Sequence, residues 1–276
     1  MIDGAVGNDD DGPLASPAPS ARRWTFPGLR RKARPPSSVP AGVRLYAIGD
    51  IHGRRDLLDT LLDKIRADDA ARAPAQTHVV LLGDLVDRGP ESAAVVQRAM
   101  QGLDWATMTT LRGNHEQMLL DALNRTYPML DLWLSAGGDA TLESWGVDPA
   151  VVARASPEDL LAAADAAIPA AHRSWIGQLP INIGFGDYYF VHAGIRPGVA
   201  IDRQTERDAL WIRKPFLTSN RDHGVVVVHG HTISPAVEVH HNRIGIDTGA
   251  YRSGRLTALG LEGTERWLLS TRSETP

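Results

Sequence analysis

The sequence predicts an α/β protein, and three observations predict it. Short apolar segments follow one another from Val43 onward, and most of them end in Gly, Asp, Asn or His. These segments are apolar on both faces, which is typical of strands that are covered on both sides. The early segments are separated by stretches with helical spacing of apolar residues. Strand and helix in alternation is the pattern of an α/β fold.

The predicted elements follow in chain order. Helices are expected at 56–71, where Leu58, Leu61 and Ile65 recur at helical spacing, and at 91–100. A further helix is expected to follow Asn114. The predicted strands cover residues 43–50, 78–84, 106–114, 188–194, 225–231, 244–249, 255–263 and 265–270.

Two segments depart from this alternation. Residues 127–179 are rich in Ala and Trp with helical spacing, and Ser156 is a typical helix N-cap, so we expect a helical insertion there. Residues 1–41 hold seven of the 18 prolines and lack apolar periodicity. They are expected to form a disordered tail whose removal leaves the domain at 42–276 intact.

Composition excludes several classes of function. The chain has 276 residues, 29 Lys and Arg against 33 Asp and Glu, and no cysteine. Disulfides, thiolate metal sites and a cysteine nucleophile are therefore excluded, and the near-neutral charge argues against a nucleic-acid partner. No apolar run is long enough to span a membrane, and the acidic start does not resemble an export signal, so a cytoplasmic protein is expected. The oligomeric state stays open.

Polar side chains gather where the predicted strands end. The carboxyl ends of strands in an open α/β sheet meet at one crevice, so these side chains are expected to lie together. Asp50 and His52 are two residues apart and would point the same way in an extended chain. The complete set is Asp50, His52, Asp84, Asp87, Arg88, Arg112, Asn114, His115, His192 and His231.

Six of these side chains are nitrogen or oxygen ligands that suit two divalent cations of the Mn, Fe or Zn kind. Asp84 is the expected bridge between the two ions. His229 alternates with His231 on one strand end, and His231 is preferred because it stands in a Gly-His-Thr context. The six predicted ligands are Asp50, His52, Asp84, Asn114, His192 and His231.

The remaining polar residues suit phosphate chemistry. Arg88 and Arg112 can bind phosphate oxygens in bidentate fashion. His115 is free to protonate a leaving oxygen, and Asp87 can orient it and favour its charged form. Together these residues predict metal-assisted hydrolysis of a phosphoester.

Six motifs stand in order along the chain. They are GDIHG (49–53), GDLVDRG (83–89), LRGNHEQM (111–118), HAGI (192–195), HGHT (229–232) and IDTGAY (246–251). In order and rough spacing they resemble the phosphoprotein phosphatases among the calcineurin-like metallophosphoesterases, and most of all the bacterial and bacteriophage lambda type of serine/threonine phosphatase. The resemblance runs from about residue 46 to 261.

The resemblance implies a four-layer α/β/β/α sandwich with a helical insertion, in which the segment WLSAGGD at 133–139 has a counterpart. It also implies direct attack on a phosphate monoester by a hydroxide that bridges two metal ions, with manganese the expected metal. The implied roles are Asp50, His52 and Asp84 for the first metal; Asp84, Asn114, His192 and His231 for the second; Arg88, Arg112 and Arg213 for phosphate; and His115 with Asp87 for leaving-group protonation.

Several functions stay open on these residues. The preferred substrate is a protein phosphorylated on serine or threonine, with phosphotyrosine as a variant. Symmetrical diadenosine tetraphosphate hydrolases share the same centre, and Trp133, Trp145 or Trp175 would then line an adenine slot. A non-catalytic metal-binding scaffold is disfavoured because every expected ligand is present. A cyclic phosphodiesterase or nuclease is disfavoured by the three arginines, which suit a terminal phosphate.

Overall fold

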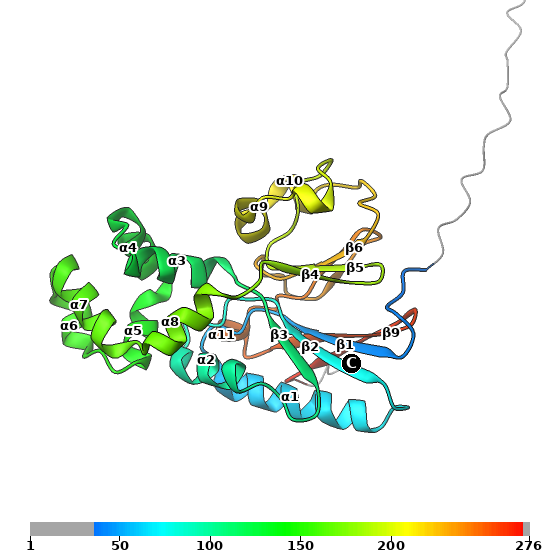
Figure 1. Ribbon diagram of the computed structural model, residues 1–276, viewed down its shortest axis with the longest axis horizontal. Coiled ribbons are helices and arrows are strands. Elements are labelled where there is room, and N and C mark those ends of the chain that lie inside the picture. The colour runs from blue at the N-terminus through cyan, green and yellow to red at the C-terminus, as the bar shows by residue number, and fades with distance from the viewer. Residues whose placement is uncertain (1–35, 273–276) are drawn as a thin grey trace, which may run out of the picture. The chain divides into compact units, whose positions relative to one another are not determined.

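A computed structural model describes residues 36–272 of the chain. Within this range the strands form two five-stranded sheets (Figure 1). The first sheet has the order β10-β9-β1-β2-β3. Strands β1, β2 and β3 are parallel, β9 runs antiparallel to β1, and β10 runs antiparallel to β9. Its strands are β1 (Val43–Ile48), β2 (Gln76–Leu81), β3 (Thr107–Thr110), β9 (Thr257–Glu262) and β10 (Glu265–Ser270).

The second sheet has the order β4-β5-β6-β8-β7. Its central strands β5, β6 and β8 are parallel, and the edge strands β4 and β7 run antiparallel to their neighbours. Neither edge strand was predicted, because β4 is half exposed and β7 is two exposed residues, so both lack an apolar run. The strands are β4 (Asn182–Phe185), β5 (Tyr188–Val191), β6 (Val226–His229), β7 (Glu238–Val239) and β8 (Arg243–Gly245).

The elements form four layers. The two sheets share a buried core that joins residues such as Leu45 and Phe190, whereas Tyr46 and Ile48 point to the opposite face and pack under helices. Helices α1 (Arg55–Ala70) and α2 (Ser92–Gln101) cover the first sheet. Short helices α9 (Glu206–Trp211) and α10 (Lys214–Leu217) cover the second. The predicted α/β/β/α sandwich is confirmed (Figure 1).

A group of helices follows β3 and lies beside the sandwich rather than over its sheets (Figure 1). Ser156 caps one of these helices by accepting a hydrogen bond from the backbone N–H of Asp159, as predicted. The group contains α3 (Asn114–Leu123), α4 (Tyr127–Trp133), the π-helical turn η1 (Leu134–Gly138), α5 (Asp139–Ser144), α6 (Pro149–Arg154), α7 (Pro157–Ala167) and α8 (Ala170–Gly177). The remaining helices are η2 (Ile201–Arg203) and α11 (Ala250–Ser253). None of the helices in residues 36–272 is long and apolar enough to cross a bilayer.

Apart from β10, the predicted strands end earlier in the structure than expected. β1 ends at Ile48, so Asp50 and His52 lie in a loop, and His52 has a φ of 46°. The expectation that these two side chains share a direction along an extended chain is therefore wrong. The strands end where the run of buried apolar residues ends, because the polar residues that follow do not pack against the core. The glycines among these polar residues allow the chain to turn.

The domain was predicted to begin at residue 42, but in the structure it begins earlier. The Val39 side chain is only 3% exposed, and the Val39 N–H donates to the carbonyl of Gly263. Ser38 donates from both its backbone N–H and its hydroxyl to Asp187. This part of the predicted tail therefore closes the core between the sheets, and residues 1–35 lie outside the described residues.

Replacing Val39 by Ala should lower the free energy of unfolding by about 1–2 kcal/mol, because buried methyl groups are lost. Urea denaturation measures this change. Val239→Ala is the matched control, since Val239 is 60% exposed, and it should change stability by less than about 0.5 kcal/mol. Equal effects of the two substitutions would contradict the packing role of Val39.

Candidate metal centre

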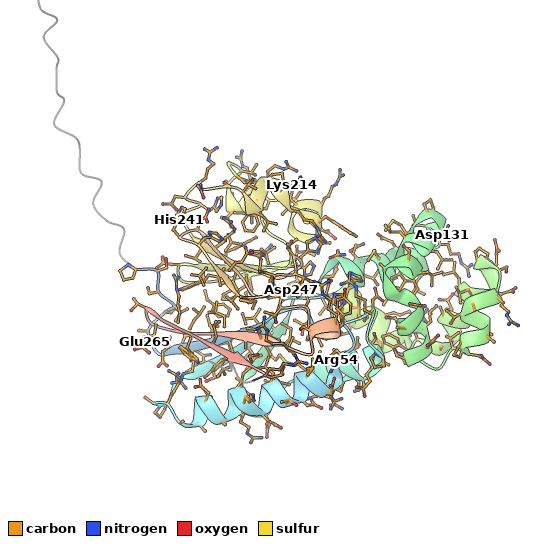
Figure 2. All side chains as sticks on the ribbon, turned by 180° about the vertical axis from the view of Figure 1, so that it is seen from behind. Arg54, Asp131, Lys214, His241, Asp247 and Glu265 are labelled. Carbon is orange, nitrogen blue, oxygen red and sulfur yellow. The ribbon has the colours of Figure 1, made fainter. Side chains whose placement is uncertain are left out.

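Loops from both sheets meet at one edge of the sandwich. The chain leaves β1, β2 and β3 of the first sheet and β5, β6 and β8 of the second at this edge, each time with polar residues. Figure 2 labels Asp247, which follows β8 and lies in the central part of the molecule. The residues delivered are Asp50 and His52 after β1, Asp84 after β2, Asn114 and His115 after β3, His192 after β5, His231 after β6 and Asp247 after β8.

Asp84 lies at the middle of this cluster. Its Oδ2 atom is 3.6 Å from Nε2 of His52, and its Oδ1 atom is 3.4 Å from Nε2 of His192. Two groups of three side chains could each hold a metal ion, because the ligand atoms inside each group lie within 4.8 Å of one another. One group is His52, Asp84 and His115, and the other is Asp84, His192 and His231. Asp84 belongs to both groups, which is the arrangement that a bridging carboxylate requires.

Backbone contacts orient the histidine rings. Nδ1 of His52 lies 2.8 Å from the carbonyl of Val86, and Nδ1 of His192 lies 2.9 Å from the carbonyl of Leu82. A donor at Nδ1 leaves the lone pair of the ring on Nε2, which faces the cluster. His231 has the opposite orientation, because its Nδ1 lies 2.8 Å from Oδ1 of Asn114 while its Nε2 accepts from Arg213.

The second histidine of the His-Gly-His-Thr segment at 229–232, His231, is the one that reaches the cluster. His229 is also buried, but its ring packs against Phe216 and Gly245 on the other side of β6. Burial lowers the pKa of His229 to about 4, so it is a neutral core side chain. The choice of His231 over His229 thus agrees with the geometry.

Burial and mutual charge shift the pKa values in this cluster. Burial alone would raise the pKa of Asp84, but the surrounding histidines lower it well below its usual value. Burial lowers the pKa of His52 to about 3 and that of His231 to about 2. The cluster therefore offers an ionised carboxylate and neutral imidazoles at neutral pH, which are the forms that bind metal ions.

Asp50 lies beside Asp247, a residue to which sequence reasoning gave no role. Asp50 accepts the backbone N–H of His231, and its carboxyl group lies close enough to that of Asp247 for their charges to interact. Burial raises the pKa of Asp50 well above its usual value, and the charges of Asp247 and Asp84 raise it further. The signal that could have found Asp247 was its place in the polar segment after β8.

Glu116 is a second residue that sequence reasoning passed over. Its buried carboxylate accepts the backbone N–H groups of Asp84, Leu85, Val86 and Gly113 at 2.7–3.2 Å. It thereby fixes the loop after β2 to the loop after β3. Gly113 makes this approach possible, because a Cβ atom there would lie 2.1 Å from Oδ1 of Asp84.

Replacing Glu116 by Gln should destabilise the fold by about 2–3 kcal/mol, because the amide NH₂ would face backbone donors in place of an acceptor. The urea midpoint measures this loss. Glu143→Gln, at an exposed position of α5, is the matched control and should leave the midpoint unchanged. A stable Glu116→Gln protein would show that the two loops are fixed by other contacts.

The backbone of this region is strained. Among the described residues, six other than glycine have a positive φ, and five of them are His52, Asp84, Asp87, Arg88 and His231. Such conformations cost free energy and persist where surrounding contacts impose them, which is common at functional sites. This strain is concentrated in the residues that the motifs singled out.

His115 and Asp87 form a buried pair at the side of the cluster. Nδ1 of His115 lies 2.6 Å from Oδ2 of Asp87, and Nε2 lies 3.8 Å from Oδ2 of Asp84. Burial lowers the pKa of His115, but Asp84 and Asp87 outweigh it and raise that pKa above its usual value. The charged imidazolium that proton donation needs is therefore favoured.

A cavity of about 180 Å³ opens onto this cluster. Arg88 and Arg213 lie on its wall, and the Arg88 guanidinium is 3.0 Å from the Nε2 atoms of His52 and His115. The lining residues are Asp84, Arg88, Asn114, His115, Met118, Leu132, Ala136, Trp211, Arg213 and His231. Two guanidinium groups, two histidines and Asp84 thus face one space that a phosphate group fits.

Arg112 differs from the expectation. Its guanidinium donates to Gln117 and Glu206 and to the carbonyls of Gly177 and Leu179. These acceptors hold it between α3, α8 and α9 instead of directing it into the cavity. Acceptors from segments distant in the sequence decide its direction, which its position beside Asn114 could not show.

The tryptophans also differ from the expectation. Trp133 is fully buried and donates its indole N–H to Asp87, so it offers no slot for a base. Trp145 donates to His172 and packs within the helices, and Trp175 is partly buried there. The tryptophan at the cavity is Trp211, which is 37% exposed.

The cluster fits two divalent cations. Its atoms are carboxylate and amide oxygens and imidazole nitrogens, which suit Mn, Fe or Zn. Asp50, Asp84 and Asp247 are all buried, and burying carboxylates this close together is costly without positive charge between them. Residues Asp50, His52 and Asp84 would hold one ion, and Asp84, Asn114, His192 and His231 would hold the other.

A family model described as calcineurin-like phosphoesterase matches residues 43–262. The chain belongs to this family. The match includes every residue of the cluster, and the ligand types of the cluster are those of a metal-dependent phosphoesterase. The match therefore covers all strands of the two sheets except β10, the helices that cover the sheets and the loops that carry the cluster.

Relatives of this phosphoesterase carry two kinds of name. Serine/threonine-protein phosphatase 2 of Escherichia coli is 28% identical and aligns over 77% of this chain and 90% of its own length. Serine/threonine-protein phosphatase 1 of Salmonella typhimurium is 43% identical, but over only 34% of this chain and 39% of its own length. A symmetrical bis(5'-nucleosyl)-tetraphosphatase of Dechloromonas aromatica is 34% identical over 58% of this chain and 47% of its own length.

A solved structure described as a candidate diadenosine tetraphosphatase has a TM-score of 0.59 and 23% identity, and the match covers 84% of this chain and 98% of that one. At this identity the likeness shows the fold alone. The chain also spans less than half the length of the Salmonella and Dechloromonas relatives. The comparisons thus establish the family, and the substrate has to be inferred from the residues of the site.

Proposed function

We propose that this phosphoesterase hydrolyses phosphate monoesters on phosphorylated serine and threonine side chains of proteins. The observation that carries the proposal is the cavity in which Asp84, Arg88, His115 and Arg213 meet. About 180 Å³ accommodates one phosphate group with a short alkyl chain. An alkoxide is a poor leaving group, so a proton donor on the cavity wall suits these substrates.

The residues that line the cavity have separate roles in this proposal. Arg88 and Arg213 bind the phosphate oxygens from opposite sides of the cavity, and His115, oriented by Asp87, gives its proton to the departing oxygen. The chemistry that two divalent ions supply at such a site is neutralisation of phosphate charge and activation of water as the nucleophile. Manganese is the ion that we propose, with iron and zinc as alternatives.

A second candidate substrate is a symmetrical dinucleoside tetraphosphate. Trp211 favours it, because this side chain stands 37% exposed on the cavity wall and offers a ring on which a base can stack. Leu132, from α4, is exposed on the same wall and widens the apolar surface. The same apolar surface also suits the residues that flank a phosphorylated serine.

A side-by-side assay tests the proposal. The metal-stripped protein is given manganese and offered phosphoserine, phosphothreonine and phosphotyrosine peptides and diadenosine tetraphosphate, with Asp84→Asn as the blank. Higher kcat/KM for phosphoserine and phosphothreonine peptides supports the proposal. Higher kcat/KM for the dinucleotide, together with a marked rise in its KM in Trp211→Ala, would replace it with the second candidate.

A further inference from the structure

The carboxylate of Asp87 receives hydrogen bonds from beyond the metal-binding loops. Trp133 donates its indole N–H at 2.9 Å to Oδ1 and 3.1 Å to Oδ2, and the Thr141 hydroxyl donates to Oδ1 at 2.6 Å. Trp133 and Thr141 are 46 and 54 residues further along the chain, in the helices beside the sandwich. Asp87 is completely buried, so no water replaces these donors.

Thr141 and Gly137 of these helices, together with Ser92 at the start of α2, hold the backbone of this loop. The N–H of Asp87 donates to the hydroxyl of Thr141 at 2.8 Å and to that of Ser92 at 3.0 Å. The N–H of Arg88 donates to the carbonyl of Gly137 at 3.1 Å. Asp87 and Arg88 have φ values of 73° and 72°, so these bonds hold two strained residues in place.

The π-helical turn η1 places the donors. Gly137, with a φ of 106°, lies so close to Arg88 that a Cβ atom would come within 2.7 Å of the Arg88 backbone nitrogen. A Cβ atom on Gly138 would come within 2.5 Å of the Trp133 ring. The two glycines therefore let the chain kink at Gly137 and approach both Arg88 and the Trp133 ring closely.

We infer that Trp133 and Thr141 are positioning residues for leaving-group protonation. They keep the carboxylate of Asp87 aimed at Nδ1 of His115, so that Nε2 of His115 faces the cavity. The helices beside the sandwich thus act on the reaction through Asp87 rather than by touching the substrate. This inference rests on the proposed function, in which His115 is the proton donor.

The test compares two substrates that differ in their need for a proton donor. A phosphoserine peptide releases an alkoxide and needs one, whereas p-nitrophenyl phosphate releases a stable phenolate and does not. Thr141→Val and Trp133→Phe should lower kcat for the peptide about 10- to 100-fold and kcat for p-nitrophenyl phosphate less than about threefold. Thr141→Ser, which keeps the hydroxyl, should restore kcat for the peptide.

Trp145→Phe is the matched control. It removes an indole N–H from the same group of helices, but one that donates to His172 and not to Asp87. It should leave the ratio of the two kcat values unchanged. Thermal melting and metal content of each variant show whether the fold and metal binding are intact. If Trp133→Phe melts early, Thr141→Val still tests the inference, because this substitution is nearly isosteric.

Each outcome decides the inference. A selective loss on the peptide, rescued by Thr141→Ser, supports it. Equal losses on both substrates, or no loss on either, would overturn it, because a structural role alone does not distinguish leaving groups. If the wild-type protein hydrolyses neither substrate, the proposed function itself is overturned and this inference with it, which separates the two failures.

Discussion

Replacement of Asp84 by Asn should lower kcat by about 10³-fold or more on every substrate of this phosphoesterase. The substitution keeps the shape of the side chain but removes the charge that both groups of ligand atoms share. One of the two former oxygens becomes an NH₂ group that has no lone pair for a cation. Bound manganese per chain should fall with the activity, since the shared position serves both ions.

Elemental analysis of the purified protein and steady-state kinetics measure the two changes separately. Asp131→Asn, at an exposed position on α4, is the matched control and should leave both unchanged. Figure 2 shows Asp131 on the helices beside the sandwich, away from Asp247. Full activity in a metal-loaded Asp84→Asn protein would contradict the assignment of Asp84 to the metal centre. Metal binding by a wild-type protein without any hydrolysis would instead favour a non-catalytic scaffold.

Replacement of His115 by Asn should have the second-largest effect and a different pattern. On a phosphoserine peptide kcat should fall about 10²- to 10⁴-fold, because the alkoxide leaves without a proton. On p-nitrophenyl phosphate the fall should be less than about tenfold, because that leaving group is stable as an anion. The KM for either substrate should change little, since Arg88 and Arg213 still line the cavity.

The kinetics of the two substrates, measured on one preparation, give this comparison directly. His240→Asn is the control, because His240 is an exposed side chain outside the cluster. A uniform loss on both substrates would assign His115 to the metal centre, where its Nε2 lies 3.8 Å from Asp84, rather than to proton donation. The contrast between Asp84→Asn and His115→Asn thus separates the two roles.

The fold class follows from the sequence alone, and so does the expectation that polar residues gather at one edge of the sheets. Buried apolar segments predict strands at nearly every place where the structure has one in the core, because burial on both faces leaves a local pattern. The polar residues that end those segments, such as Asp50, Asp84 and His192, meet because parallel strands end at the same edge. No contact between distant segments had to be known for that argument.

Only the tertiary structure decided how these residues are held. The sequence shows that Trp133 stands in a motif, but not that its indole donates to Asp87, 46 residues earlier. It places Arg112 beside Asn114, but not the acceptors in α8 and α9 that turn its guanidinium away from the cavity. Asp247 and Glu116 were passed over because their partners come from other loops.

The physical reason is the range of the interactions. Apolar periodicity records which face of an element is buried, and it is written in a few neighbouring residues. The direction of a loop side chain depends on donors and acceptors that folding brings from elsewhere, and the positive φ values of Asp84 and Asp87 persist only under those contacts. The sequence by itself determined at which strand ends the polar groups of this phosphoesterase stand, and the tertiary structure decided which of them face the cavity and which hold the others in place.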